Sequence, residues 1–270
     1  MAENAAVGTN SVFALVRYNL DGSLDASFGS GGVTDLVTAT PTALLRQSDG
    51  KLIVAATGAG GMWVLRYLPD GSLDTAFSGD GKIVVAGAET NYEGFSIIEQ
   101  SDGKIVVAGK CVNGPASLDF YIVRLTSGGE LDPTFGGDGT VTTDFGTTND
   151  KAFSIIQQGD GKLVAAGVTG FIPESDNSNN IALVRYNSDG TLDNAFDGDG
   201  KLSTNISTGS GRDFAYSIVQ SADGNLVVAG SADMYDSSDD VVVIKYKPDG
   251  QIDTLFGVNG VSVTSFGVRA

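Results

Sequence analysis

The sequence contains no histidine and a single cysteine, Cys111, and its acidic residues outnumber its basic ones by 33 to 16. The lack of histidine excludes Ser-His-Asp and Cys-His catalysis, and any metal site that depends on imidazole. One cysteine cannot form a disulfide within the chain. The net charge of −17 repels phosphate groups, so nucleic acids and anionic membrane surfaces are not expected as partners.

Long apolar runs are also missing. No stretch of about 18 consecutive apolar residues occurs, which predicts that the chain does not insert into a membrane. The first residues carry neither a basic segment nor a long apolar run, so no signal peptide is expected there.

Glycine, in contrast, is abundant, with 38 residues in a chain of 270. Such a content is unfavourable in helices and is typical of an all-β protein with many turns. The hydrophobic fraction of 41% is that of a globular protein and not of a disordered one. We therefore expect residues 1–270 to form a single all-β domain.

One sequence motif, which we call the phrase, occurs five times. Its fullest form is the stretch from Arg185 to Gly200, Arg-Tyr-Asn-Ser-Asp-Gly-Thr-Leu-Asp-Asn-Ala-Phe-Asp-Gly-Asp-Gly. A second signal, Asp-Gly followed by an apolar run, lies about half a period away from it. Both recur at a period of roughly 60 residues, which indicates a repeat architecture. The Leu-Asp step of the phrase begins at Leu24, Leu73, Leu131, Leu192 and Ile252, and the second signal begins at Asp49, Asp102, Asp160 and Asp223.

Each period contains four short strand signals separated by turn residues. In one period they lie at 152–158, 162–168, 181–187 and 201–206, with Asp-Gly in the first hairpin turn. This pattern predicts an antiparallel four-stranded unit, which cannot bury both of its faces alone. Radial stacking of such units gives a β-propeller, which we favour over a linear β-solenoid because solenoid coils are shorter and lack hairpin turns.

The strand signals predict five blades, of which the first is incomplete. The repeat units span about 1–40, 41–90, 91–150, 151–212 and 213–270, and the first offers only a third and a fourth strand. An unpaired strand edge favours association. The chain is therefore either a segment of a longer array or a protein that self-associates through its incomplete blade.

The repeated phrase, Arg-Tyr-Asn-x-Asp-Gly-Ser-Leu-Asp-x-x-Phe-Gly, and the second signal, Gln-x-Asp-Gly-Lys-Ile-Val-Val-Ala-Gly, resemble the delta-60 repeat family. The resemblance covers nearly the whole chain. It implies a β-propeller module of a large bacterial protein, secreted or exposed at the cell surface, and it implies no particular activity. The segments that carry it are 17–29, 47–55, 100–109, 124–136, 157–167, 185–196 and 220–230.

The arginine, the aspartate and the phenylalanine of the phrase recur in nearly every unit, for example as Arg124, Asp132 and Phe135. A ring of identical functional sites is one interpretation. Repetition in every blade favours a structural one, in which arginine and aspartate pair and phenylalanine packs between blades.

Carboxylates also gather in the glycine-rich end of the phrase, and most closely at Asp193, Asp197 and Asp199. Hard oxygen ligands suit calcium, but no EF-hand loop is present because the downstream glutamate is missing. These aspartates are also ordinary turn residues. We therefore expect no cofactor, with calcium at these three aspartates as the one alternative.

The connections from second to third strands, and from fourth strands to the next first strand, lie on one side of a propeller. They vary in length and composition here, whereas the turns on the other side are stereotyped. Because function concentrates on variable loops held by a rigid scaffold, candidate ligand-binding residues are sought on this irregular side. They are Tyr92, Glu93, Asp119, Phe171, Arg212, Asp213, Tyr235 and Asp236.

These observations predict a non-enzymatic interaction or scaffold module with a protein or carbohydrate partner. The alternative is a propeller that binds calcium or a carbohydrate on its irregular side. A glycosidase would need two carboxylates about 5 to 10 Å apart, and no pair stands out from the acidic background.

Overall fold

The computed structural model describes residues 11–85, 92–112, 117–146, 149–170, 179–207, 211–233 and 239–265. Within these ranges it contains strands and turns and no helix, and the strands form four antiparallel sheets of four. No helix there could cross a membrane. Each sheet follows chain order, with neighbouring strands paired, as the four-strand pattern of each repeat predicts.

We number the four complete sheets as blades 1 to 4 and call residues 11–39 the incomplete blade. Blade 1 comprises β1 (Thr40–Arg46), β2 (Leu52–Gly58), β3 (Gly61–Tyr67) and β4 (Lys82–Val85). Blade 2 comprises β5 (Glu93–Glu99), β6 (Ile105–Val112), β7 (Leu118–Leu125) and β8 (Thr140–Thr143). Blade 3 comprises β9 (Lys151–Gln157), β10 (Leu163–Thr169), β11 (Asn180–Tyr186) and β12 (Lys201–Thr204). Blade 4 comprises β13 (Asp213–Gln220), β14 (Leu226–Asp233), β15 (Asp239–Tyr246) and β16 (Val261–Thr264).

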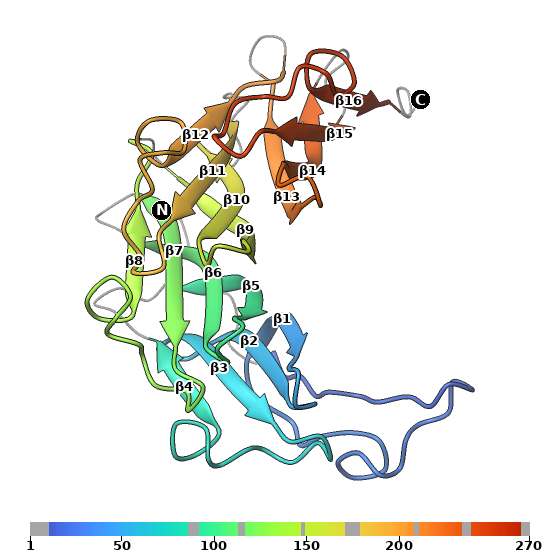
Figure 1. The fold of residues 1–270 in the computed structure, drawn as a ribbon. Coiled ribbons are helices and arrows are strands. Elements are labelled where there is room, and N and C mark those ends of the chain that lie inside the picture. Colours follow the sequence, from blue (N-terminus) through green and yellow to red (C-terminus); the bar gives the residue numbers. More distant parts are fainter. Residues whose placement is uncertain are drawn as a thin grey trace, which may run out of the picture.

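The blades follow one another along an open arc (Figure 1). The first strands, β1, β5, β9 and β13, lie on the inner, concave side, and each contacts the first strand of the next blade. The fourth strands lie on the outer side and are only four residues long. The all-β fold and the propeller arrangement of four-stranded blades are thus confirmed.

The incomplete blade is a loosely paired hairpin. Its pairs are isolated bridges, Phe13 with Val37 and Val16 with Val33, and they correspond to third-to-fourth strand pairing in the other blades. Phe13 is buried against blade 1. The described part of this blade therefore contains the third and fourth strand positions, as predicted.

The hydrophobic core is divided among the junctions between blades. The cluster between blades 1 and 2 joins Met62 and Val64 to Ile97, Ile105 and Val123, and similar clusters fill the next two junctions. Successive strand residues face opposite neighbouring blades. Each inner blade therefore buries its two faces against the blades on either side of it.

Equivalent tyrosines at the ends of third strands give a testable contrast. The hydroxyl of Tyr186 is 2.7 Å from that of Thr143 in the preceding blade, whereas the buried hydroxyl of Tyr67 has no partner among the described residues. Losing a buried hydrogen bond costs about 1 to 3 kcal/mol when a partner is left unsatisfied. We expect Tyr186→Phe to destabilise the protein by about 1 to 2 kcal/mol and Tyr67→Phe to be neutral or stabilising. Urea unfolding of both variants checks this, and equal losses would contradict it.

Candidate functional site

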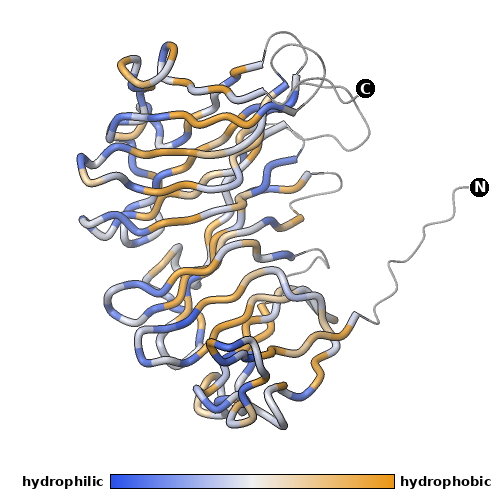
Figure 2. Tube along the Cα trace, turned by 90° about the vertical axis from the view of Figure 1, so that its right-hand side faces the viewer, coloured by the Kyte–Doolittle hydropathy of each residue, from blue (hydrophilic) through white to orange (hydrophobic). Residues whose placement is uncertain are grey.

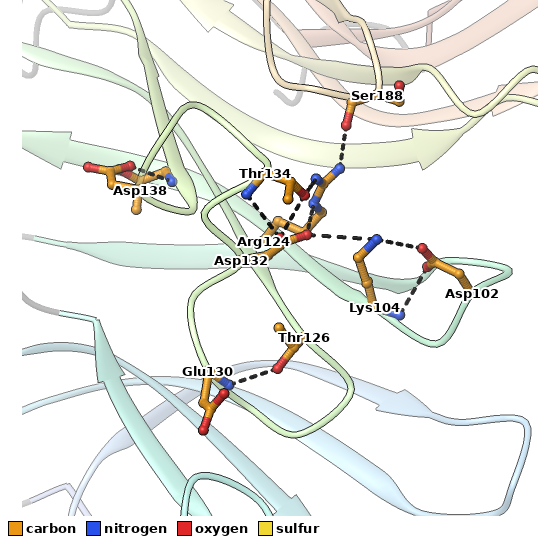
Figure 3. Close-up of polar contacts among 10 residues, drawn as sticks. Asp102, Lys104, Arg124, Thr126, Glu130, Asp132, Thr134, Asp138 and Ser188 are labelled. Atoms are coloured by element: carbon orange, nitrogen blue, oxygen red, sulfur yellow. Dashed lines mark hydrogen bonds and ion pairs between the residues drawn. The ribbon is translucent and has the colours of Figure 1, made fainter.

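The repeated arginine and aspartate form an ion pair that is buried in blades 1, 2 and 3, and the arginine links each of these blades to the next (Figure 3). In blade 2, Nε of Arg124 donates to Oδ2 of Asp132 at 2.8 Å and Nη2 donates to Thr134 at 2.9 Å, while Nη1 donates to the Ser188 carbonyl of blade 3. The guanidinium lies 4.6 Å from the centre of the Phe135 ring. The same pairing recurs as Arg66–Asp74, Arg185–Asp193 and the more exposed Arg17–Asp25, whereas blade 4 carries Lys245 in place of the arginine.

The repeated phenylalanine packs on a turn of the next blade, which is Asp-Gly at three junctions and Gly128-Gly129 at the fourth. A methyl group added to Gly71, Gly129, Gly190 or Gly250 would lie 2.5 to 3.1 Å from the ring of the preceding blade's phenylalanine. The interpretation of these repeated residues as structural therefore agrees with their geometry, and the candidate site lies elsewhere.

The concave side has a different repeated feature, a β-bulge in every first strand. The residue that the bulge inserts is aromatic in three blades, where it is Phe95, Phe153 or Tyr216, and is Thr42 in blade 1. A bulge adds one residue to a strand and redirects its side chain. Here it places aromatic side chains on the inner strands of blades 2, 3 and 4.

In blades 2, 3 and 4 a glycine of the neighbouring second strand lies against the bulge. A Cβ atom at Gly109, Gly167 or Gly230 would lie 1.7 to 1.8 Å from a backbone carbonyl oxygen of the first strand. Only glycine allows the two backbones to approach so closely. The glycine of the Val-Val-Ala-Gly motif is therefore explained by the bulge, and blade 1, which carries Ala56 there, pairs it with Pro41.

The aromatic side chains form one continuous row across three blades, which we call the aromatic row. The ring centroids of Phe95 and Phe153 are 5.5 Å apart, and those of Phe153 and Tyr216 are 5.8 Å apart. Phe214 extends the row by stacking on Tyr216 at 5.6 Å with an interplanar angle of 6°. Tyr216 is 52% exposed, and the other three are partly exposed.

Polar groups flank the row at the irregular-side ends of the strands. Lys110 forms an ion pair with Glu93 at 3.1 Å. Burial and the nearby charge of Lys110 lower the pKa of Lys151, and the charge of Glu93 offsets this only in part. Glu93 and Lys151 each stand two residues before an aromatic of the row, Phe95 and Phe153. The site therefore combines flat apolar surface with both hydrogen-bond donors and acceptors.

The structure places the other predicted ligand-binding residues in different surroundings. Tyr92 is 8% exposed and packs edge-on against Tyr121, and Asp119 is fully buried. Arg212 is 3.6 Å from Asp233. Phe171, Tyr235 and Asp236 lie outside the described residues.

Asp213, another predicted ligand-binding residue, is fully buried between blades 3 and 4. Its Oδ2 accepts a hydrogen bond from the backbone N–H of Ile206 at 2.7 Å, and its Oδ1 accepts one from the Ser207 hydroxyl. Burial raises the pKa of Asp213, although these hydrogen bonds oppose the shift. Its contacts are those of a cap that holds the connection between the blades.

The three aspartates predicted for calcium point to separate partners. Asp193 contacts Arg185 at 2.6 Å and Lys162 at 2.9 Å, and Asp199 accepts from the N–H of Lys201 at 2.9 Å. Burial and the charges of Asp199 and Asp249 raise the pKa of Asp197. Calcium binding by these residues stays a prediction.

A second acidic group, which the sequence reading did not single out, lies between blades 2 and 3. Asp119, Asp144 and Asp150 each offer a carboxylate oxygen within 4.8 Å of the others. Asp150 accepts hydrogen bonds from the backbone N–H groups of Phe145 and Gly170 at 2.9 and 3.2 Å. These contacts hold the connection between the blades, as Asp213 does at the next junction.

The sequence reading also missed the aromatic row, although a signal was present. An aromatic precedes Ser-Ile in the first strands of blades 2, 3 and 4, and the second strand carries a glycine at a fixed distance. Together they mark the bulge, but only the inner position of the strands shows that the aromatics meet.

Comparison with protein families gives one match. The model described as "Domain of unknown function (DUF5122) beta-propeller" matches five segments, one in each repeat unit, which together make up more than half of the chain. It supports a β-propeller repeat family and does not carry the delta-60 name. No curated protein matches the sequence. The five segments are 4–28, 47–77, 100–135, 158–196 and 221–256.

Solved structures with a similar fold have little sequence in common with the chain. A protein of unknown function from Dyadobacter fermentans is 10% identical, with a TM-score of 0.50, over 89% of this chain and 71% of its own. A virginiamycin B lyase from Staphylococcus aureus is 12% identical, with a TM-score of 0.44. The match covers 88% of this chain and 59% of the lyase. A sialidase from Streptococcus pneumoniae is 14% identical, with a TM-score of 0.46, over 74% of this chain and 30% of its own.

These comparisons correct one prediction. The sequence reading predicted a protein without enzymatic activity, and this is wrong as an inference from the repeat, because the similar folds include a lyase and a sialidase. The lack of histidine excludes only chemistry that needs imidazole. Carboxylate chemistry depends on distances that a sequence does not contain. At these identities the similarity shows the fold and assigns no reaction.

Proposed function

Because the chain belongs to the DUF5122 β-propeller family, whose description states no activity, we propose a function from the site itself: a binding module that holds a carbohydrate on the aromatic row. The observation that supports this most strongly is the placement of Phe95, Phe153 and Tyr216 at equivalent bulges of three neighbouring strands. Packing within a single blade does not require that three separate bulges present aromatic side chains on one surface.

The chemistry of the row favours a sugar over other flat ligands. Aromatic rings offer apolar faces on which the C–H groups of a sugar ring can pack, and the tyrosine hydroxyl is a polar handle. Glu93 and Lys151, both partly exposed beside the row, supply acceptors and donors for sugar hydroxyls. Nucleotide bases also stack on aromatics, but the net charge of −17 opposes their phosphates.

The proposal moves the ligand from the irregular loops to the concave side and retains Glu93 from the residues predicted there. We also retain a secreted or cell-surface location in a bacterium, which the family resemblance implied. Such a location would bring the aromatic row into contact with extracellular glycans.

Isothermal titration of the protein with a panel of soluble oligosaccharides tests the proposal. We expect saturable binding of at least one sugar class, and a loss of at least tenfold in affinity for Phe153→Ala, because Phe153 contacts both neighbouring rings of the row. Trp63→Ala is the matched control, since this aromatic lies in blade 1 and pairs with Lys82 instead. Circular dichroism establishes that both variants fold.

Two results would contradict the proposal. One is the absence of binding by every sugar at millimolar concentration. The other is a sugar that binds Phe153→Ala as tightly as the unchanged protein.

A further inference from the structure

The two ends of the arc expose the two halves of the junction that joins every pair of neighbouring blades. Each of the four junctions has the same backbone contact, in which the residue after the repeated phenylalanine donates its N–H to the next blade. The acceptor is the carbonyl of an Asp-Gly turn or, at one junction, of Gly128. The pairs are Gly29 to Asp70, Ser78 to Gly128, Gly136 to Asp189 and Asp197 to Asp249, at 2.6 to 2.9 Å.

Blade 4 exposes the first half of this junction. Its phenylalanine, Phe256, is partly exposed, whereas Phe28, Phe77, Phe135 and Phe196 are at most 1% exposed. Val241 is 45% exposed, although Phe120 and Ile181 at the equivalent positions are fully buried against the following blade. Among the described residues, the N–H of Gly257 has no acceptor in a following blade.

The incomplete blade exposes the second half. A methyl group added to Gly22 would meet no atom within 4 Å, although the equivalent glycines of blades 1 to 4 each contact a phenylalanine. Val16 and Tyr18 are 45% and 63% exposed, whereas the equivalent Val184 and Tyr186 are fully buried. The face that receives a preceding blade is therefore formed here and uncovered.

The two ends also carry the tyrosine and threonine hydroxyls that meet at other junctions, so they match in more than apolar character. Tyr186 and Tyr246 each contact a threonine of the preceding fourth strand, Thr143 at 2.7 Å and Thr204 at 3.1 Å. In blade 2 the third strand ends in Leu125, which has no hydroxyl group, and the fourth strand of blade 1 correspondingly ends in Val85 and not in threonine. The incomplete blade carries a tyrosine at this position, Tyr18, and blade 4 carries a threonine, Thr264. The two ends thus match each other as neighbouring blades do.

We propose that blade 4 of one copy binds the incomplete blade of a second copy. In this contact Phe256 packs on Gly22, the N–H of Gly257 donates to the Asp21 carbonyl, and Tyr18 meets Thr264. The contact continues an interface that the chain already forms four times. Within one copy the two ends lie apart, on either side of the arc's open side (Figure 1). A head-to-tail contact of this kind closes into a ring or extends into a filament.

The net charge sets the conditions for the contact. Each copy carries −17, and like charges of this size oppose association until salt screens them. The contact itself joins apolar side chains and uncharged hydrogen-bonding groups, so salt should strengthen it and not weaken it.

Sedimentation of the 270-residue protein over a range of concentration tests the proposal. We expect species of at least two copies, with more association at 0.5 M than at 0.05 M sodium chloride, roughly above and below physiological ionic strength. Val16→Asp and Val241→Asp, one at each end, should each weaken association at least tenfold. Val84→Asp is the matched control, because Val84 is 38% exposed on the outer strand of blade 1, away from both ends. A mass of one copy under all conditions, or association that both end variants leave unchanged, overturns the proposal.

Cross-linking identifies which ends meet. The only native cysteine, Cys111, is buried, and burial raises the pKa of its thiol to about 11, so it is a poor target for thiol reagents. Asp21→Cys and Val258→Cys are made as separate variants; Val258 follows Gly257 directly and is 78% exposed, so a cysteine there is accessible. Mixing them with a short bis-maleimide should join one copy of each. A variant that carries both cysteines is treated in the same way. If this double variant alone is cross-linked, and within a single copy, the chain closes on itself and the second-copy proposal is wrong.

Discussion

Replacing Asp132 with alanine is expected to lower the free energy of unfolding by about 3 to 5 kcal/mol, because it leaves the Arg124 guanidinium buried without its countercharge. Arg124 and Asp132 are only 4% and 3% exposed, and they are held in one geometry by Thr134 and the Ser188 carbonyl. The loss should extend beyond blade 2, since the same guanidinium links it to blade 3. Guanidinium chloride unfolding followed by circular dichroism measures it.

The matched control is Asp25→Ala in the incomplete blade. The same pair forms there, with Nε of Arg17 at 2.8 Å from Asp25, but the side chains are 37% and 24% exposed. Exposed pairs contribute little to stability because solvent screens them, so we expect a loss far smaller than that of Asp132→Ala. Equal losses at the two positions would show that the buried pair is not what holds the blades together.

The same pair predicts a dependence on pH. Burial alone would raise the pKa of Asp132, but hydrogen bonds from Thr134 and the charges of Arg124 and Lys104 outweigh it and hold the pKa below its usual value. A lowered pKa in the folded state gives stability that is present above the unfolded pKa of about 4 and is lost as the pH falls through the folded value. The difference in stability between the unchanged protein and Asp132→Ala should therefore shrink below about pH 4.

The second large effect is expected at the bulge. Replacing Gly167 with alanine should destabilise the protein by about 3 kcal/mol, because an added group in a closely packed site forces the backbone to shift. The new Cβ would lie 1.8 Å from the carbonyl oxygen of Lys151, and backbone cannot move aside as a flexible side chain can. The bulge at Phe153 should be lost or displaced, and sugar binding with it.

Gly159→Ala separates this clash from a general effect of losing glycine. Gly159 lies in the hairpin turn of the same blade, an added Cβ there would meet no atom within 4 Å, and its φ is not positive. We expect a change of no more than about 0.5 kcal/mol in either direction. Thermal unfolding of the two variants side by side tests the contrast, and comparable losses would rule out the backbone contact as the cause.

Local sequence patterns are sufficient to specify the blade. Hairpin turns at Asp-Gly, short β-branched runs and a fixed period specify four antiparallel strands, because all of these depend on neighbouring residues. Repetition also identified Arg124, Asp132 and Phe135 as structural, since a contact needed at every junction must recur in every unit. The incomplete first blade followed from counting strands. Hydropathy along the chain follows the same pattern, with apolar strands between polar turns (Figure 2).

Which residues lie on a surface, and which of them meet there, depends on how the blades stack. Tyr92 and Asp213 belong to irregular connections in the sequence, yet both are buried, because Tyr92 packs against Tyr121 and Asp213 accepts hydrogen bonds from Ile206 and Ser207. Phe95, Phe153 and Tyr216 are far apart along the chain and become neighbours only because the first strands converge on the concave side. The match between Tyr18 and Thr264 likewise has meaning only once the ends of the arc are known. Local patterns fix strands and turns, whereas sites and interfaces arise from residues in different repeats, whose distances depend on how the blades stack.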